Sequence, residues 1–190
     1  IATRTLSTYV NDWLIDDAGA ISYVYVSQYN RISVLTQNTN AFAELSFLDV
    51  NCRRIFLLND DTVPQAELGC VEDSYGDDST INIYNNDGGT LTLKRQMTLP
   101  ITGIDEVIAD PTSTNEQSFL VYFTVNDQSF SYNSPATRSI GYISRDGKLI
   151  WRSAGLLNAT QDANLRAKQN ASGKLELIFN NFTIGYWVKQ

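Results

Sequence analysis

The sequence predicts an all-β fold, an antiparallel β-sandwich of roughly a dozen strands. Short stretches alternate apolar and polar residues along most of the chain, as strands with one buried face do. Turn-forming Asn, Asp and Gly residues separate these stretches at hairpin spacing. Apolar residues at helical spacing are scarce. The alternative within the all-β class is a propeller-like stack of β-hairpins.

The first strands are predicted at residues 21–27 and 31–36, followed by 43–49 and 53–58. Residues 41–48 fit a short helix as well as a strand, because periodicity does not separate the two at that length. Ahead of them, residues 6–14 fit either one helical face or an extended N-terminal arm over residues 1–10.

The clearest hairpin spans residues 80–94. Ile81 and Ile83 share one face of its first strand, and Leu91 and Leu93 repeat that pattern on its second. The turn between them ends in Asp-Gly-Gly, and glycine accepts the positive φ angles of tight hairpin turns.

Three further strand pairs are predicted in the second half of the chain. Residues 119–125 turn into Phe130 and Tyr132, residues 140–144 into 149–151, and residues 175–179 into 182–188; a single strand is expected at 165–169. Glu176 alternates with two leucines and is expected to face solvent. The core is expected to hold all three tryptophans, Trp13, Trp151 and Trp187, because their neighbours alternate as in buried strands.

The pattern in residues 144–151, with Ser144, Asp146, Gly147 and Trp151, resembles the Asp-box hairpin of sialidase-type propellers, Ser-x-Asp-x-Gly-x-x-Trp. The glycine falls one position early. The C-terminal strand pair is similar to those of bulb-type mannose lectins but lacks their Gln-x-Asp-x-Asn-x-Val-x-Tyr run. Each resemblance covers about a dozen residues and implies hairpin chemistry, so no functional residue is carried over.

A length of 190 residues suits one domain with a sizeable core, so a single domain over 1–190 is expected. The strongest change in composition lies at residues 100–117, a weak internal break between two sheets or lobes.

Composition excludes several classes of site. Histidine is absent, which removes Ser-His-Asp and Cys-His nucleophiles, haem-histidine ligation and histidine-zinc sites. A net charge of −7 and a pI near 4.5 argue against a nucleic-acid partner. No apolar run approaches the ~20 residues of a membrane-spanning helix.

Cys52 and Cys70 are expected to form a disulfide that closes a turn-rich loop. Two reduced buried cysteines are the alternative. The disulfide, together with many Asn, Ser and Thr residues and few Lys, predicts a secreted, periplasmic or cell-surface protein.

An acidic loop at residues 72–78 is the candidate metal site. Asp73, Asp77 and Asp78 offer the oxygen ligands that Ca²⁺ prefers, and Gly76 allows a sharp bend. The loop does not match the twelve-residue calcium motif, and a solvated acidic loop is the other interpretation.

Aromatic residues make up 11% of the chain, and four tyrosines lie near predicted turns: Tyr29, Tyr75, Tyr84 and Tyr132. A tyrosine beside Asn or Asp can stack on a sugar ring or a protein partner while the polar groups bind hydroxyls. The predicted ligand-binding residues are therefore Tyr75, Asp73, Asp77, Asp78, Tyr84 and Asn86.

Three functions fit these observations. The first is a non-catalytic extracytoplasmic binding or adhesion module for a glycan or a protein. The second is a structural subunit of a surface assembly that self-associates through terminal edge strands, within residues 1–8 and 180–190. The third is a small carboxylate-dependent hydrolase, although no two of the six glutamates can be paired from sequence.

Overall fold

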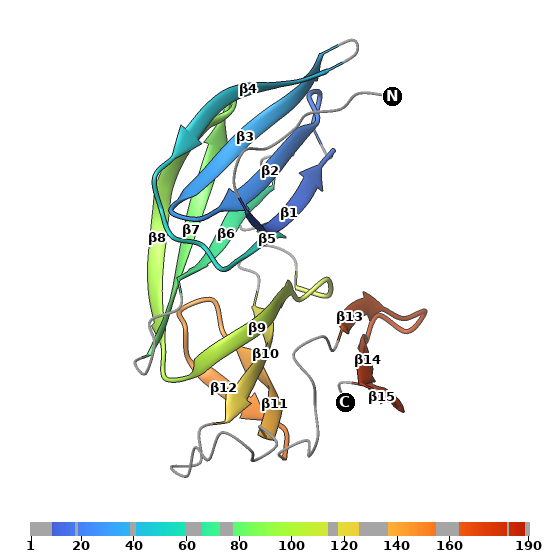
Figure 1. The fold of residues 1–190 in the computed structure, drawn as a ribbon. Coiled ribbons are helices and arrows are strands. Elements are labelled where there is room, and N and C mark those ends of the chain that lie inside the picture. The colour runs from blue at the N-terminus through green and yellow to red at the C-terminus, as the bar shows by residue number, and fades with distance from the viewer. Residues whose placement is uncertain are drawn as a thin grey trace. The chain divides into compact units, whose positions relative to one another are not determined.

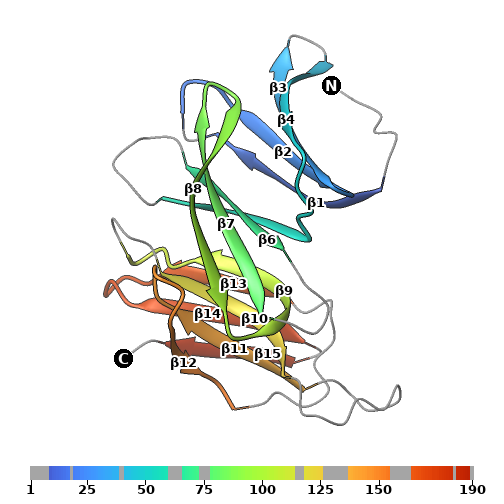
Figure 2. The same ribbon diagram turned by 90° about the vertical axis from the view of Figure 1, so that its left-hand side faces the viewer.

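In a computed structural model the chain is all β, as predicted, and every helix or strand assigned to its described residues is a β-strand in an antiparallel sheet. The structure describes residues 9–17, 19–38, 41–59, 66–72, 78–113, 118–125, 137–154, 164–181 and 183–188. Within these ranges the strands form four sheets. In each sheet they pair in their order along the chain, so every sheet is a simple meander (Figures 1 and 2).

The strands have the following bounds. The first sheet contains β1 (Val10–Asp16), β2 (Tyr23–Gln28), β3 (Arg31–Asn38) and β4 (Ala41–Leu48). The second contains β5 (Arg54–Leu58), β6 (Glu67–Glu72), β7 (Ser79–Asp87) and β8 (Thr90–Leu99). The third contains β9 (Thr102–Ala109), β10 (Phe119–Val125), β11 (Thr137–Ile143) and β12 (Leu149–Arg152). The fourth contains β13 (Asn164–Gln169), β14 (Leu175–Asn181) and β15 (Thr183–Val188).

The chain divides into two compact units. Unit 1 comprises Ile1–Glu72 and Thr80–Met97, and unit 2 comprises Asp73–Ser79 and Thr98–Gln190. The main division, between Met97 and Thr98, precedes the composition change predicted at residues 100–117. Whether the chain behaves as one domain stays a prediction.

Unit 1 is a two-layer packing of its two sheets. The core cluster joins Tyr25 and Val34 of the first sheet to Leu68 and Tyr84 of the second, and β1 lies beside β5. Alternation explains this arrangement, because every second residue of β2 and β3 points to the same face. Face-to-face packing of antiparallel sheets is the sandwich arrangement that the sequence predicts.

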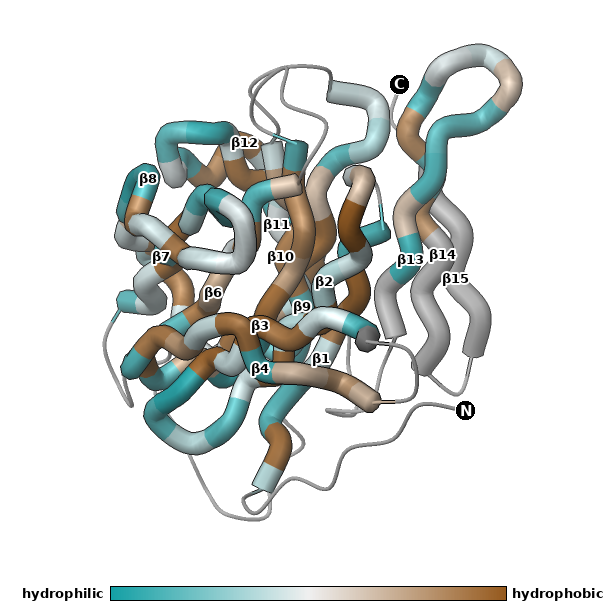
Figure 3. The backbone as a smooth tube through the Cα atoms, turned by 90° about the horizontal axis from the view of Figure 1, so that it is seen from above, coloured by the Kyte–Doolittle hydropathy of each residue, from teal (hydrophilic) through white to brown (hydrophobic). Residues whose placement is uncertain are grey.

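Unit 2 repeats this arrangement with its own core. Leu120 and Tyr122 of β10 and Ile140 of β11 pack with Leu175 and Leu177 of β14. The central strand β10 is hydrophobic along most of its length (Figure 3). A strand buried on both faces has such a continuous apolar sequence, whereas a half-buried strand alternates.

Several elements differ from expectation. Residues 41–48 form strand β4, and the first segment is extended from Val10 onward; residues 1–8 lie outside the described residues. Strands β6 and β9 were not predicted. The 80–94 hairpin has longer strands and a two-residue turn, Gly88-Gly89, with both φ angles positive. The predicted strand at Phe130 and Tyr132 also lies outside the described residues.

The expectation of buried tryptophans was wrong for Trp13 and Trp151, which are 63% and 39% exposed. The side chain of Trp187 lies outside the described residues. Glu176, expected in solvent, is only 8% exposed, because it lies on the central strand β14 opposite Lys168, whose Nζ is 3.2 Å from its Oε2. Leu93 is 58% exposed, so it does not share the burial of Leu91.

Candidate binding face on the first sheet

The first sheet has an apolar surface on the side turned away from the unit 1 core. In its register Trp13 and Ile15 of β1 lie opposite Val26 and Val24 of β2. These valines lie opposite Ser33 and Leu35 of β3, and Ser33 lies opposite Phe47 of β4. Since opposite residues share a face, the register places one set on this side. We call this set the aromatic face: Trp13, Ile15, Val24, Val26, Leu35 and Phe47.

The aromatic face combines exposed rings with a buried aliphatic floor. Trp13, Ile15 and Phe47 are 63%, 50% and 51% exposed, whereas Val26 and Leu35 are 5% and 3% exposed. The register also places Ser33 on this side, between Val26 and Phe47, and Glu44 opposite Leu35. Exposed apolar side chains grouped on one face of a sheet often mark an interaction site.

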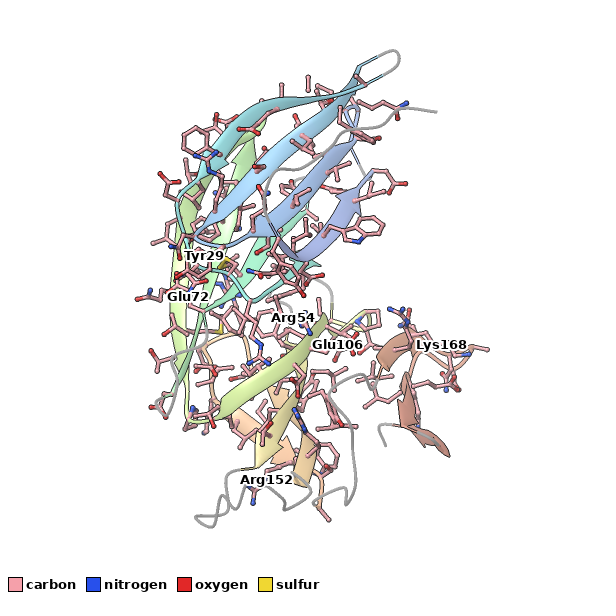
Figure 4. The ribbon with its side chains drawn as sticks, in the orientation of Figure 1. Tyr29, Arg54, Glu72, Glu106, Arg152 and Lys168 are labelled. Carbon is pink, nitrogen blue, oxygen red and sulfur yellow. A yellow bond between two sulfur atoms is a disulfide. The ribbon has the colours of Figure 1, made fainter. Side chains whose placement is uncertain are left out.

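Polar groups border the aromatic face at one end. The Arg31 guanidinium lies 3.9 Å from the centre of the Phe47 ring, and its Nε is 3.6 Å from Oδ1 of Asp49. Tyr29, 74% exposed, lies in the turn between β2 and β3, two residues before Arg31 (Figure 4). Asn30 completes that turn with φ of 58°, a conformation that Asn tolerates better than most residues. Ring surfaces and exposed donors and acceptors therefore lie at the same end of the sheet.

The sheet that carries this face is tied to the second sheet by polar contacts around Cys52. The Cys52 carbonyl accepts hydrogen bonds from Ser27 Oγ at 2.6 Å and from Asn11 Nδ2 at 3.1 Å. Asp12 Oδ2 accepts the Ile55 amide at 3.0 Å. These bonds hold β1 and β2 against the start of β5.

The predicted disulfide is confirmed. Cys52 and Cys70 are bonded, with their Cα atoms 5.5 Å apart, and both are buried. The bond joins the segment before β5 to β6. Cys52, whose carbonyl accepts hydrogen bonds from β1 and β2, is therefore covalently fixed to the second sheet.

Two of the predicted ligand-binding residues take part in interior contacts. Tyr84 is 5% exposed in the unit 1 core, and burial raises its pKa. Asn86 Nδ2 donates to Tyr25 Oη at 2.6 Å, while Asn86 Oδ1 accepts the Gly89 amide at 2.7 Å. Burial also raises the pKa of Tyr25. The structure thus places both residues on the core side of the sheets, and their binding role stays a prediction.

The predicted acidic loop, residues 72–78, is described only at its first and last residues. Asp73, Tyr75 and Asp77 lie outside the described residues, and Asp78 is exposed just before β7. At the start of the loop, Glu72 Oε1 accepts a hydrogen bond from Asn82 Nδ2 at 2.7 Å. Across the described ranges, no group of three His, Cys, Asp or Glu side chains is arranged to hold a metal ion. The calcium prediction is therefore untested.

Unit 2 contains buried charged side chains that contact one another or nearby polar groups in the interior. Asp105 and Arg138 form an ion pair with side chains 2% and 4% exposed, and the guanidinium lies 5.9 Å from the centre of the Tyr122 ring. Asp110, fully buried, accepts hydrogen bonds from the Thr112 amide at 2.8 Å and from Tyr142 Oη at 2.7 Å. These contacts fix turns and strand ends in the interior.

The aromatic face was not predicted as a site, although the sequence holds a signal for it. In β2, Tyr23 and Tyr25 face the core, yet Val24 and Val26 make the opposite face apolar as well. A strand that is apolar on both faces needs cover on both. That signal is weak, because a strand at the centre of a stack gives the same pattern.

No protein-family model matches the chain, and no curated protein is significantly similar to it. A search of the described residues finds no helix that is both long and apolar enough to cross a membrane.

Proposed function

We propose that the chain is a non-catalytic binding module and that the aromatic face is its ligand-binding surface. The observation that carries this proposal is the exposure of Trp13 and Phe47 on one sheet face, with an Arg31–Asp49 pair at its border. Covering exposed rings with a ligand is favourable, and a strand pairing that is already formed avoids the cost of ordering the backbone on binding.

The ligand class favoured by this chemistry is a glycan. The apolar face of a sugar ring stacks on tryptophan or phenylalanine, while its hydroxyls both donate and accept hydrogen bonds. The exposed guanidinium of Arg31 donates and the carboxylate of Asp49 accepts. Tyr29, in the adjoining turn, adds a further exposed ring with a polar hydroxyl. A protein segment is the other ligand that such a surface suits.

The proposed location is outside the cytoplasm, at the cell surface, in the periplasm or secreted. The Cys52–Cys70 disulfide supports this, because disulfides persist in oxidising compartments. A glycan ligand is consistent with the same location.

The test is a glycan array probed with the full chain and with Trp13→Ala. Removal of the indole should reduce the signal at least about tenfold, a loss of ~1.4 kcal/mol of binding free energy. Trp151→Ala is the matched control, since it removes an exposed tryptophan from unit 2 and should leave the signal unchanged.

Other outcomes separate the alternatives. A folded chain that binds no glycan but captures a protein through Trp13 would replace the glycan with a protein ligand. Loss of binding in Tyr75→Ala but not in Trp13→Ala would move the site to the acidic loop predicted from sequence. Turnover of a chromogenic glycoside that depends on one Asp or Glu would favour the hydrolase.

A further inference from the structure

Strand β15 is an unusual edge strand. Seven of the eight strands at the sheet edges carry at least one charged residue: Asp12 in β1, Glu44 in β4, Arg54 in β5, Lys94 in β8, Glu106 in β9, Arg152 in β12 and Lys168 in β13. The sequence of β15, Thr-Ile-Gly-Tyr-Trp-Val, contains none and no proline. Charged side chains on edge strands discourage pairing with other chains.

Bulges protect several of the other edges but not this one. The registers of β1, β4, β9 and β12 with their neighbours are interrupted, which twists an edge away from a straight partner. β15 pairs with β14 in an unbroken register from Thr183 to Val188. It therefore presents a regular backbone edge rich in residues that favour strands.

The fourth sheet is also one strand shorter than the others. The first three sheets each have four strands, and within the described residues the fourth has β13, β14 and β15 alone. In unit 1 the first strands of the two sheets, β1 and β5, lie side by side, and in unit 2 β9 and β13 do so. This correspondence makes β13 the first strand of its sheet. Among the described strands, the place without a strand is therefore the one beyond β15.

We propose that this place is taken by β15 of a second copy of the chain, so that two copies pair antiparallel, edge to edge, about a two-fold axis. The charges of the two edge strands of this sheet favour self-pairing through β15 over self-pairing through β13. Self-pairing of β13 would bring Arg166 and Lys168 near the same residues of the second copy, whereas the uncharged β15 pairs with itself without such repulsion. The pairing is isologous and closed, so it yields a dimer and not a filament.

The test measures the mass of the full chain by sedimentation at about 1 to about 100 μM, a range that spans the dissociation of a micromolar dimer. We expect a dimer at the upper end. Tyr186→Lys and Tyr186→Glu each place like charges across the two-fold axis, and each should weaken the dimer at least about tenfold. Tyr186 lies opposite Ile178 in the register of β14 and β15.

An equimolar mixture of the two variants should restore the dimer, because lysine then meets glutamate. This restoration separates loss of pairing from loss of folding. Thr92→Lys, on the already charged edge strand β8, is the matched control and should leave the dimer intact. A monomer at every concentration, or a dimer unaffected by both Tyr186 variants, would overturn the proposal. Neither result bears on glycan binding by the aromatic face.

Discussion

The buried ion pair between Asp105 and Arg138 is the residue-scale contact with the clearest energetic consequence. Both side chains are nearly inaccessible, so each charge depends on its neighbours for the solvation it loses on folding. Asp105→Ala should lower the free energy of unfolding by ~3–5 kcal/mol, because the guanidinium is left buried without that carboxylate. Urea denaturation monitored by circular dichroism measures the loss.

A paired substitution provides the control for that prediction. Asp105→Ala combined with Arg138→Met removes both charges and should recover most of the lost stability. A double variant as unstable as Asp105→Ala alone would show that the aspartate stabilises the fold by other means.

Buried tyrosines predict a loss of stability at alkaline pH. Desolvation raises the pKa of Tyr122 from 10.0 to about 12, and burial also raises the pKa of Tyr25 and Tyr84. The unfolded chain releases these protons near pH 10, while the native chain retains them, so folding is favoured below that pH. Stability should fall as the pH rises from 10 towards 12. Phenolate absorbance and unfolding followed together should show some tyrosines ionising only as the chain unfolds.

Residue positions on a face were predictable, but exposure was not. Alternation correctly placed Tyr23 and Tyr25 on one face of their strand. It also placed Glu176 on the face opposite to that of Leu175 and Leu177. It did not reveal which faces are covered, because cover comes from other sheets. For that reason Trp13 was expected inside and Glu176 outside, and both expectations were wrong.

Element prediction succeeded where turns are marked by glycine or asparagine. The bounds of β10 were predicted, and the glycines of the β7–β8 turn adopt the positive φ expected of them. β6 and β9 were missed. β6 begins and ends with glutamate and contains Gly69, while β9 contains Gly103, Asp105 and Glu106. Such residues disfavour strands when considered alone, and pairing with β7 and β10 overrides that preference.

Gly69 of β6 leaves room for the ring of Phe56 on the neighbouring strand. An ideal Cβ at this position would overlap the ring of Phe56, which is opposite it on β5. Gly69→Ala should therefore force the ring to move and destabilise the fold by ~1–3 kcal/mol. Phe56→Leu combined with Gly69→Ala should cost less than the sum of the single changes. Strict additivity in thermal or urea unfolding would contradict this contact.

The disulfide joins two elements of unit 1 and should contribute measurably to stability. Its cysteines are 18 residues apart, and closing a loop of that size stabilises a fold by ~3 kcal/mol on the chain-entropy model. Reduction should lower the urea midpoint by a corresponding amount. Cys52→Ser/Cys70→Ser should behave like the reduced chain and be insensitive to reductant; equal midpoints with and without reductant in the unmodified chain would contradict this role.

At the scale of the whole molecule, the two proposed interactions use two different surfaces. The aromatic face lies on unit 1, and the outer edge of β15, beyond which no described strand lies, belongs to unit 2. The sequence predicted terminal edge strands within residues 180–190, which include β15, but it did not predict the aromatic face as a site. The reason is physical: a binding face is defined by the absence of cover, which depends on how sheets stack and not on local pattern.

The most direct measurement of the central claim follows the indole N–H signals of Trp13, Trp151 and Trp187 by NMR while the best glycan from the array is added. The account predicts that the Trp13 signal shifts with ligand concentration and saturates, while the Trp151 signal stays in place. A bound glycan that leaves Trp13 unchanged would contradict the assignment of the binding site to the aromatic face.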